Sequence, residues 1–490
     1  MPAKRRKLVL TYVDSLRTDM LERAVVEARA PTFGALLERG VLIPDCVSSF
    51  PSVTPVACAE MVTGVAADQH WISGMNWYHR LERRYVEYGS SLDATRTVGV
   101  FRALYDLVYN MNLAHLNPEA ETLFERLDDA GVRTACTPFL IYRGRHRHQV
   151  SLEGLLRRAV ETTRLKFRHH TWGPAELFYG DLYASREVPC KSTSIPGDRD
   201  RYSACCAAEL ERADGYDFLL LSLPDNDNYS HRHGPEASVE SIAKADSCFA
   251  ELVEAAGGLE AFLADHAVIL LADHAQTPVS RGLPLAELLG RDWTVLEPSA
   301  ERPEQAQLAV SPTGRAAHIY LLAGEGERAD HGEVRRRLTE TEGVDLVCWL
   351  EQGTATVERA GRQLRFHPGS AISDLRGVGW DLEGDPGALE ASSEGDLFSS
   401  DEYPDPLSRV FSALTAPSAG DFIISLSPGY EAVDWGGVSH AGGGSHGSLH
   451  RGDSLGPLLF VGCGPDNPDE RLQWTLRDVA PAVLDHFGLE

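Results

Sequence analysis

The sequence lacks several features that would each indicate a large class of proteins. No apolar stretch reaches the roughly 20 residues of a transmembrane helix. Positive charge is scarce, because 46 Lys and Arg stand against 72 Asp and Glu and leave a formal net charge of -26. Binding to nucleic-acid polymers or to a membrane surface needs a basic surface, so neither is expected. An anionic small molecule would have to be attracted locally by bound cations.

Cysteine pairs with redox or metal-binding spacing are also missing. The nine cysteines contain no CxxC pair, and an odd, scattered set is typical of reduced thiols in a cytosolic protein. The basic segment 1–7 resembles the start of a signal peptide, but the apolar segment after it ends at Asp14 without a small-residue cleavage site. We therefore expect reduced cysteines and a cytoplasmic location. The sequence predicts no oligomeric state.

What is present is an ordinary globular composition, with 43% hydrophobic and 24% charged residues among 490. A chain of this length can form one large α/β domain with an insertion. Strand and helix patterns alternate, which predicts a mostly parallel sheet with helices on both faces. The expected strands are 7–13, 133–136, 217–223 and 267–272, and the expected helices are 119–131, 200–213 and 237–256.

The pattern changes between residues 286 and 400. Strands are expected at 317–322 and 344–350, a helix at 333–342 and a hairpin around 360–361. An acidic loop rich in Gly and Ser is expected to follow at 381–402. Strands of the sheet are expected again at 421–425 and 457–461. We therefore predict an α/β core made of residues 1–285 and 401–490, with residues 286–400 inserted as an α+β cap.

Asp273 and His274 directly follow the expected strand 267–272. A buried strand that ends in two potential metal ligands is notable, because the carboxyl edge of an α/β sheet is where such folds place their chemistry. Taken alone, a buried Asp and His could simply satisfy each other. Asp14 stands in the same place after strand 7–13, although a lone Asp there is more often a turn or capping residue.

Thr54 lies in the segment Phe50-Pro51-Ser52-Val53-Thr54-Pro55, ahead of a helix that Gly64 closes. A Thr directly before a Pro fits a helix N-cap. The same position also places a hydroxyl at the positive end of the helix, where an anionic phosphoryl group would bind. The sequence leaves both roles open.

Two later segments are dense in Asp and His. Residues 225–235 follow the strand 217–223 and could form no more than a polar loop. An Asp and a His four residues apart can also ligate one zinc, and this spacing to His231 favours Asp227 over Asp225. The segment 438–450 combines glycines with three histidines, among them His446. Each segment alone is a weak signal, but the order and placement of all of them favour a metal site.

Together these segments resemble the alkaline phosphatase superfamily, and most closely its nucleotide pyrophosphatase/phosphodiesterase branch. That family presents, in chain order, a strand-end Asp, Phe-Pro-x-x-Thr, Asp-x-x-x-His before Gly-Pro, a strand ending in Asp-His, and a late Gly-x-His-Gly. The matching positions here are Asp14, Thr54, Asp227 with His231, Asp273 with His274, and His446. The resemblance implies an alkaline-phosphatase-like α/β fold and covers most of the chain outside residues 286–400.

The resemblance also implies a two-metal site. By position, one ion would be held by Asp14, Thr54, Asp273 and His274, and the other by Asp227, His231 and His446. Two divalent cations about 4 Å apart can clamp the attacking and leaving oxygens of an in-line displacement. Coordination would also lower the pKa of the threonine hydroxyl, a poor nucleophile by itself. Zinc is the expected ion, although imidazole and carboxylate ligands also suit manganese or iron.

Two departures from the family pattern are present. The family commonly has an Asn soon after the nucleophile, whose amide helps to hold a phosphoryl oxygen, whereas three residues on this chain has Ala57. The Thr54 backbone N–H or another donor, such as Asn76 or Asn228, would then take that role in substrate binding. Ala275 follows His274, where the family usually has Gly.

The expected function is hydrolysis of a small anionic phosphate ester through a phospho-threonine intermediate on Thr54. A diester or nucleotide-type substrate is the first choice. A phosphomonoesterase or a phosphonate hydrolase is the enzyme alternative, and a metal-binding relic that serves as a binding module is the non-enzyme alternative. The intact nucleophile and the complete ligand set argue against the relic.

Overall fold

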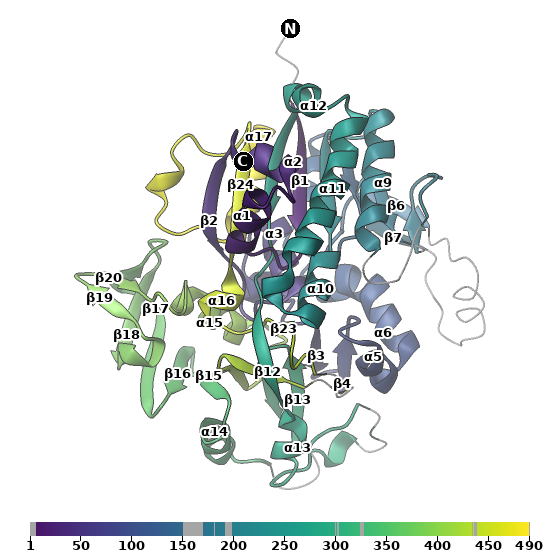
Figure 1. Cartoon of the computed structure of the whole chain (residues 1–490). Helices are drawn as coiled ribbons and strands as arrows, with labels where there is room; N and C mark the ends of the chain where they lie inside the picture. The colour runs from purple at the N-terminus through teal and green to yellow at the C-terminus, as the bar shows by residue number, and fades with distance from the viewer. Residues whose placement is uncertain are drawn as a thin grey trace.

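Two large β-sheets organise the chain, one of eight strands and one of nine, and each belongs to its own lobe (Figure 1). The computed structural model describes residues 6–149, 170–180, 182–191, 198–298, 300, 303–323, 328–433, 435 and 439–489. Within these residues, no helix is long and apolar enough to cross a membrane.

The eight-stranded sheet is mostly parallel, as the alternation of strands and helices predicts. Its central strand β1 pairs in parallel with β10 on one side and β11 on the other, and β10 pairs in parallel with β5. Antiparallel pairs lie toward the two edges. In spatial order the strands are β2 (Val41–Val47), β24 (Leu455–Val461), β11 (His266–Leu271), β1 (Lys7–Val13), β10 (Phe218–Leu223), β5 (Thr134–Cys136), β8 (Glu176–Tyr179) and β9 (Tyr183–Ala184).

Helices cover both faces of this sheet, which explains why its inner strands are continuous apolar runs. In β1, Leu8 and Leu10 point into one core cluster, whereas Val9 and Val13 point into the other. The hydrophobic core around Leu8 and Leu10 includes residues of α3 (Thr54–Thr63), the π-helix η1 (Asp106–His115), α7 (Leu123–Asp129) and α17 (Val479–His486). The hydrophobic core around Val9 and Val13 includes residues of α1 (Thr18–Val26), α2 (Pro31–Leu37), α9 (Arg199–Arg212), α11 (Val239–Ala255) and α12 (Leu259–Asp265). Of these helices, α9 and α11 lie side by side in Figure 1.

The nine-stranded sheet forms the second lobe and contains most of the predicted cap. In spatial order its strands are β13 (Leu308–Thr313), β14 (Ala316–Leu321), β21 (Phe422–Leu426), β15 (Val344–Glu351), β16 (Thr354–Arg359), β17 (Arg362–Asp374), β20 (Leu397–Ser399) and β19 (Ser392–Glu394), with β18 (Gly379–Gly384) paired to β17. The helices α13 (Leu285–Leu289), α14 (His331–Thr339) and α15 (Pro406–Thr415) pack against it.

Two expectations for this region are wrong. Segment 421–425 was expected in the core sheet, but β21 lies between β14 and β15 of the second sheet. The acidic segment 381–402 contains β18, β19 and β20 rather than only a loop. For β21, pairing with the distant strands β14 and β15 outweighs the local composition. In contrast, β18, β19 and β20 pair with each other or with the neighbouring strand β17. The division into a core and a cap stays a prediction, and its boundary at residue 400 does not coincide with the end of the second sheet.

One predicted helix begins later than expected, and one segment whose structure the sequence left open is a helix. Helix α7 begins at Leu123 rather than at residue 119, because Thr122 and Glu125 form a reciprocal capping box. The segment after β10, for which the sequence left a polar loop and a metal-binding segment open, is a helix, α10 (Asp225–His233). In a helix, residues four apart lie on the same face, so α10 brings Asp227 and His231 next to each other.

The cysteines also depart from expectation. Cys190 and Cys205 form a disulfide that joins the segment after β9 to helix α9. The expectation that all cysteines are reduced is therefore wrong for this pair. The other seven are free thiols.

Candidate active site

The first group of predicted ligands meets at the carboxyl ends of β1 and β11. These strands are parallel neighbours, so Asp14 and the Asp273–His274 pair leave the sheet at the same edge. Their ligand atoms lie within 4.8 Å of one another. The three side chains are only 0–8% exposed. We refer to Asp14, Asp273 and His274 as the first cluster.

Thr54 faces this first cluster. Val53, not Thr54, is the N-cap of α3, and no side chain caps the helix. The capping role that the sequence left open is therefore absent, and Thr54 is instead the first helical residue. Its Oγ1 lies 3.3 Å from Nε2 of His274. A hydroxyl that has no capping bond and faces a ligand group is free for another role.

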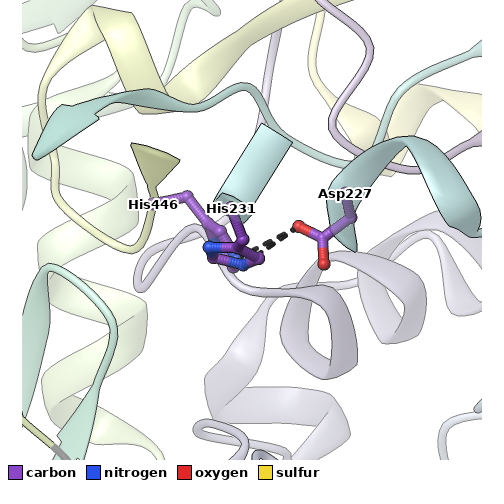
Figure 2. Close-up of side chains that lie close together, drawn as sticks. All are labelled: Asp227, His231 and His446. Carbon is purple, nitrogen blue, oxygen red and sulfur yellow. Dashed lines mark ion pairs between the residues drawn. The ribbon is translucent and has the colours of Figure 1, made fainter. Parts of the chain in front are cut away.

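The second group consists of Asp227, His231 and His446, which lie close together in Figure 2. Nε2 of His231 is 3.3 Å and Nε2 of His446 is 3.6 Å from Oδ1 of Asp227. The Nδ1 atoms contact backbone carbonyls, at 2.7 Å from Gly444 O and 2.8 Å from Ser52 O. These carbonyls require protonated Nδ1 atoms, so both Nε2 lone pairs are left for a ligand. We refer to these three residues as the second cluster.

The two clusters are adjacent. The imidazole rings of His274 and His446 stack with 3.8 Å between their centroids and 16° between their planes. Ser15 and Gln276 lie between the clusters and hydrogen-bond to Asp227. Sequence reasoning missed both residues, because a Ser after an Asp or a Gln near a His carries no pattern of its own. Their position directly beside predicted ligands was the available signal.

The carboxylates of the first cluster oppose each other's ionisation. Burial raises the pKa of Asp14 well above its usual value, and the nearby charges of Asp273 and Asp227 raise it further. Burial also raises the pKa of Asp273, to about 6. Burial lowers the pKa of His274 to about 4, which keeps its imidazole neutral at pH 7.

The second cluster is internally balanced. Burial opposes the charge of Asp227, but the His231 imidazole outweighs it and holds the pKa of Asp227 well below its usual value. Burial likewise opposes a proton on His231, yet Asp227 raises the pKa of that imidazole. His446 stays neutral, because burial and the nearby His274 lower its pKa to about 3.

The donor atoms fit two divalent cations. Both clusters offer carboxylate and imidazole groups without a thiolate, a set that suits zinc and similar ions. In the first cluster, Oδ1 of Asp14 is buried and has no hydrogen-bond partner. A buried carboxylate oxygen without a partner is costly, and a bound cation would satisfy it.

The second lobe supports the second cluster directly. The tip of the β13–β14 hairpin lies against His446, because the backbone N–H of Arg315 donates to the His446 carbonyl at 2.6 Å. Gly314 has a φ of 64°, and a Cβ there would collide with the same carbonyl oxygen. The Arg315 side chain is fully buried and pairs with Asp453 at 2.6 Å. Asp453 in turn accepts from the N–H of Ser448 at 3.0 Å, two residues after His446.

The remaining predicted residues are less directly placed. Asp225, the rival of Asp227, is occupied by Arg199 at 3.1 Å and by the N–H of Asp200 at 3.1 Å. The Asn76 amide lies in β3 (Asn76–His79) and donates to Pro312 O at 2.6 Å. Asn228 is partly exposed in α10, next to Asp227. Ala57 is fully buried in the core, so it offers no donor for a substrate.

Comparison with solved structures identifies the fold. Among solved structures, phosphonoacetate hydrolase from Sinorhizobium meliloti 1021 is similar in its complexes with phosphonoformate and with phosphonoacetate, each with a TM-score of 0.55 at 16% identity. The alignment covers 98% of this chain and 96% of the other, which shows a shared alkaline-phosphatase-like fold. No curated protein matches the chain.

A family model is more specific. The model of type I phosphodiesterases and nucleotide pyrophosphatases matches residues 8–449, which includes every residue of both clusters and Thr54. The family and the fold together indicate a hydrolase that transfers phosphoryl groups. The chain belongs to the type I phosphodiesterase/nucleotide pyrophosphatase family of the alkaline phosphatase superfamily.

Proposed function

We propose that this protein hydrolyses phosphate esters at a two-cation site, with Thr54 as the nucleophile. The observation that carries the proposal is the position of Thr54. Its Oγ1 lies 3.3 Å from His274 Nε2, it caps no helix, and it begins the ten-residue helix α3. The N-terminus of a helix attracts an anionic phosphoryl group, so nucleophile, ligands and anion site would coincide.

The proposed ligands are the residues of the two clusters, with Thr54 added to the first. When bound, the two cations would supply electrostatic stabilisation of the attacking and leaving oxygens. The Thr54 oxygen would bond to phosphorus while the bond from phosphorus to the ester oxygen breaks, which releases the alcohol and leaves a phospho-threonine. Water would then cleave the phospho-threonine and regenerate the hydroxyl. Zinc is the proposed ion, since both clusters offer imidazole and carboxylate groups.

A diester or nucleotide-type substrate remains the first choice. A bare phosphoryl oxygen of a monoester needs one more donor than a diester, in which a second group covers that oxygen. Ala57 provides no such donor, and the Asn76 amide is occupied by Pro312 O. Each preorganised donor of this kind contributes roughly 3 kcal/mol to transition-state stabilisation, so we expect diesters to react faster than monoesters.

The experiment combines metal analysis with three substrates. Purified protein should contain close to two divalent ions per chain, and turnover should follow the order bis-p-nitrophenyl phosphate, p-nitrophenyl phosphate, phosphonoacetate. A preference for p-nitrophenyl phosphate or for phosphonoacetate would favour the corresponding enzyme alternative. Two bound ions without turnover of any substrate would favour the binding module, and full activity after complete chelation would contradict the two-cation proposal.

A further inference from the structure

Ser15 is a buried hydroxyl placed between the two ligand clusters. Its Oγ lies 2.9 Å from Oδ1 of Asp227 in the second cluster and 3.2 Å from Nδ1 of His274 in the first. Its backbone N–H also donates to Oδ1 of Asp273 at 3.1 Å. The residue is 3% exposed, so the solvent cannot replace these contacts. One small side chain therefore contacts ligands of both clusters.

The backbone at Ser15 is unfavourable for a side chain. Its φ is 58°, in the left-handed region where Gly is tolerated and other residues are strained. A Gly would place the same backbone N–H against Asp273 without this strain. The presence of a serine here is therefore explained by its hydroxyl and not by the turn.

The donor and the acceptor can be assigned for each hydrogen bond of the Ser15 hydroxyl. Nδ1 of His274 lies 3.1 Å from the carbonyl oxygen of Ala275, which can only accept, so the ring proton is on Nδ1. The same Nδ1 also contacts Ser15 Oγ. The Gln276 amide also donates to Ser15 Oγ, at 3.1 Å. Because Ser15 Oγ accepts from these two donors, its own proton is directed to Asp227, an acceptor only. The hydrogen bonds thus run from the first cluster through Ser15 to the second.

We infer that Ser15 is a positioning residue that couples the two cation sites. Ser15 accepts from His274 and donates to Asp227, and it thereby fixes the orientation of the Asp227 carboxylate. A cation bound at the first cluster would then preorganise Asp227 for a cation at the second cluster. This inference rests on the proposed two-cation function. Outer hydrogen-bond partners of metal ligands typically change metal affinity or activity about 10–100-fold when they are removed.

The test is the substitution Ser15→Gly, which removes the hydroxyl and relieves the backbone at the same time. Chelator-treated protein is titrated with Co²⁺, and binding is followed by calorimetry and by the visible absorption of the bound ion. The His446→Ala variant identifies the binding event of the second cluster. We expect Ser15→Gly to weaken that event about 10–100-fold, to change the Co²⁺ spectrum and to leave the melting temperature of the metal-free protein equal or higher.

Two further variants separate the hydroxyl from the backbone. Ser15→Ala keeps the strained φ and loses the hydroxyl, and it should show the same loss of affinity as Ser15→Gly. Ala28, an exposed residue with a φ of 54°, is the matched control. Ala28→Gly relieves the same kind of backbone remote from the ligands and should leave Co²⁺ binding and its spectrum unchanged.

The outcomes distinguish this inference from the proposed function. Wild-type protein that binds two ions, together with a Ser15→Gly variant of unchanged affinity and spectrum, would overturn the inference alone. Normal binding in Ser15→Ala with weak binding in Ser15→Gly would also overturn it, because backbone freedom would then be the cause. Wild-type protein that binds fewer than two ions would overturn the proposed function and the inference with it.

Discussion

The two ligand clusters are built from similar side chains but differ in charge and in origin. The first has two carboxylates and one imidazole, is 0–8% exposed, and lies at the ends of neighbouring parallel strands. The second has one carboxylate and two imidazoles, is 11–17% exposed, and joins helix α10 to a glycine-rich loop. The register of a single sheet thus assembles the first cluster, whereas the second depends on contacts between distant segments.

This difference predicts different behaviour without metal. The pKa values of Asp14 and Asp273 are raised, so the first cluster resists full ionisation until a cation is bound. In the second cluster, Asp227 and His231 shift each other's pKa toward the charged forms and compensate each other. A bound cation should therefore stabilise the first cluster more than the second, because the charges of the second cluster already compensate each other.

The largest expected effect is that of removing the nucleophile beside the first cluster. Thr54→Ala should lower kcat by about 10³-fold or more, since Thr54 supplies the attacking oxygen in the proposed mechanism. Its melting temperature should change little, because Thr54 caps no helix. Thr54→Ser, the matched control, should keep part of the activity. Steady-state kinetics that show near-normal turnover in the alanine variant would contradict the assigned role.

The next effect concerns the support that the second lobe gives to the second cluster. Arg315→Met would leave Asp453 as an unpaired buried charge, and we expect a loss of about 3–5 kcal/mol in the free energy of unfolding. Metal titration should show that the substitution weakens binding at the second cluster more than at the first, each compared with wild type. Arg336→Met, which removes an exposed ion pair with Glu340, should stay within about 0.5 kcal/mol of wild type. Equal weakening of both cation sites would show that the support is not specific.

A smaller pair of effects should have opposite signs in the metal-free protein. Asp273→Asn removes one of two repelling carboxylates and should raise the melting temperature at pH 8 by a few degrees. Asp227→Asn removes the partner of His231 and should lower it by a similar amount. Thermal unfolding of chelator-treated protein measures both. Shifts of the same sign would show that the electrostatic contrast between the clusters is wrong.

The smallest effect is the pH dependence of the gain in melting temperature that we expect for Asp273→Asn. The folded-state pKa of Asp273, about 6, lies above its unfolded value near 4. Its contribution to stability is therefore fully present below about pH 4 and is lost as the pH rises through about 6. The advantage of Asp273→Asn over wild type should accordingly be absent at pH 4 and grow toward pH 7. An advantage that does not vary with pH would show that Asp273 is not titrating in this range.

Much of the first cluster could be predicted from local sequence. The apolar runs of β1 and β11 mark buried strands, and ligands directly after them must lie near the carboxyl edge of the sheet. The second cluster was harder, since the sequence left the local structure of residues 225–235 open and did not show that helix α10 begins there. Only the four-residue spacing of Asp227 and His231 was a usable signal, because it suits one face of a helix.

The sequence by itself determined the strands β1, β10 and β11, the Asp and His residues that follow them and the order of the family motifs, because these depend on residues close together in the chain. Tertiary structure decided what joins them. It placed β21 in the second sheet, paired Cys190 with Cys205, and set Ser15 between Asp227 and His274. Such contacts link residues up to hundreds of positions apart, and their partners are chosen by the packing of whole elements, which no local pattern records.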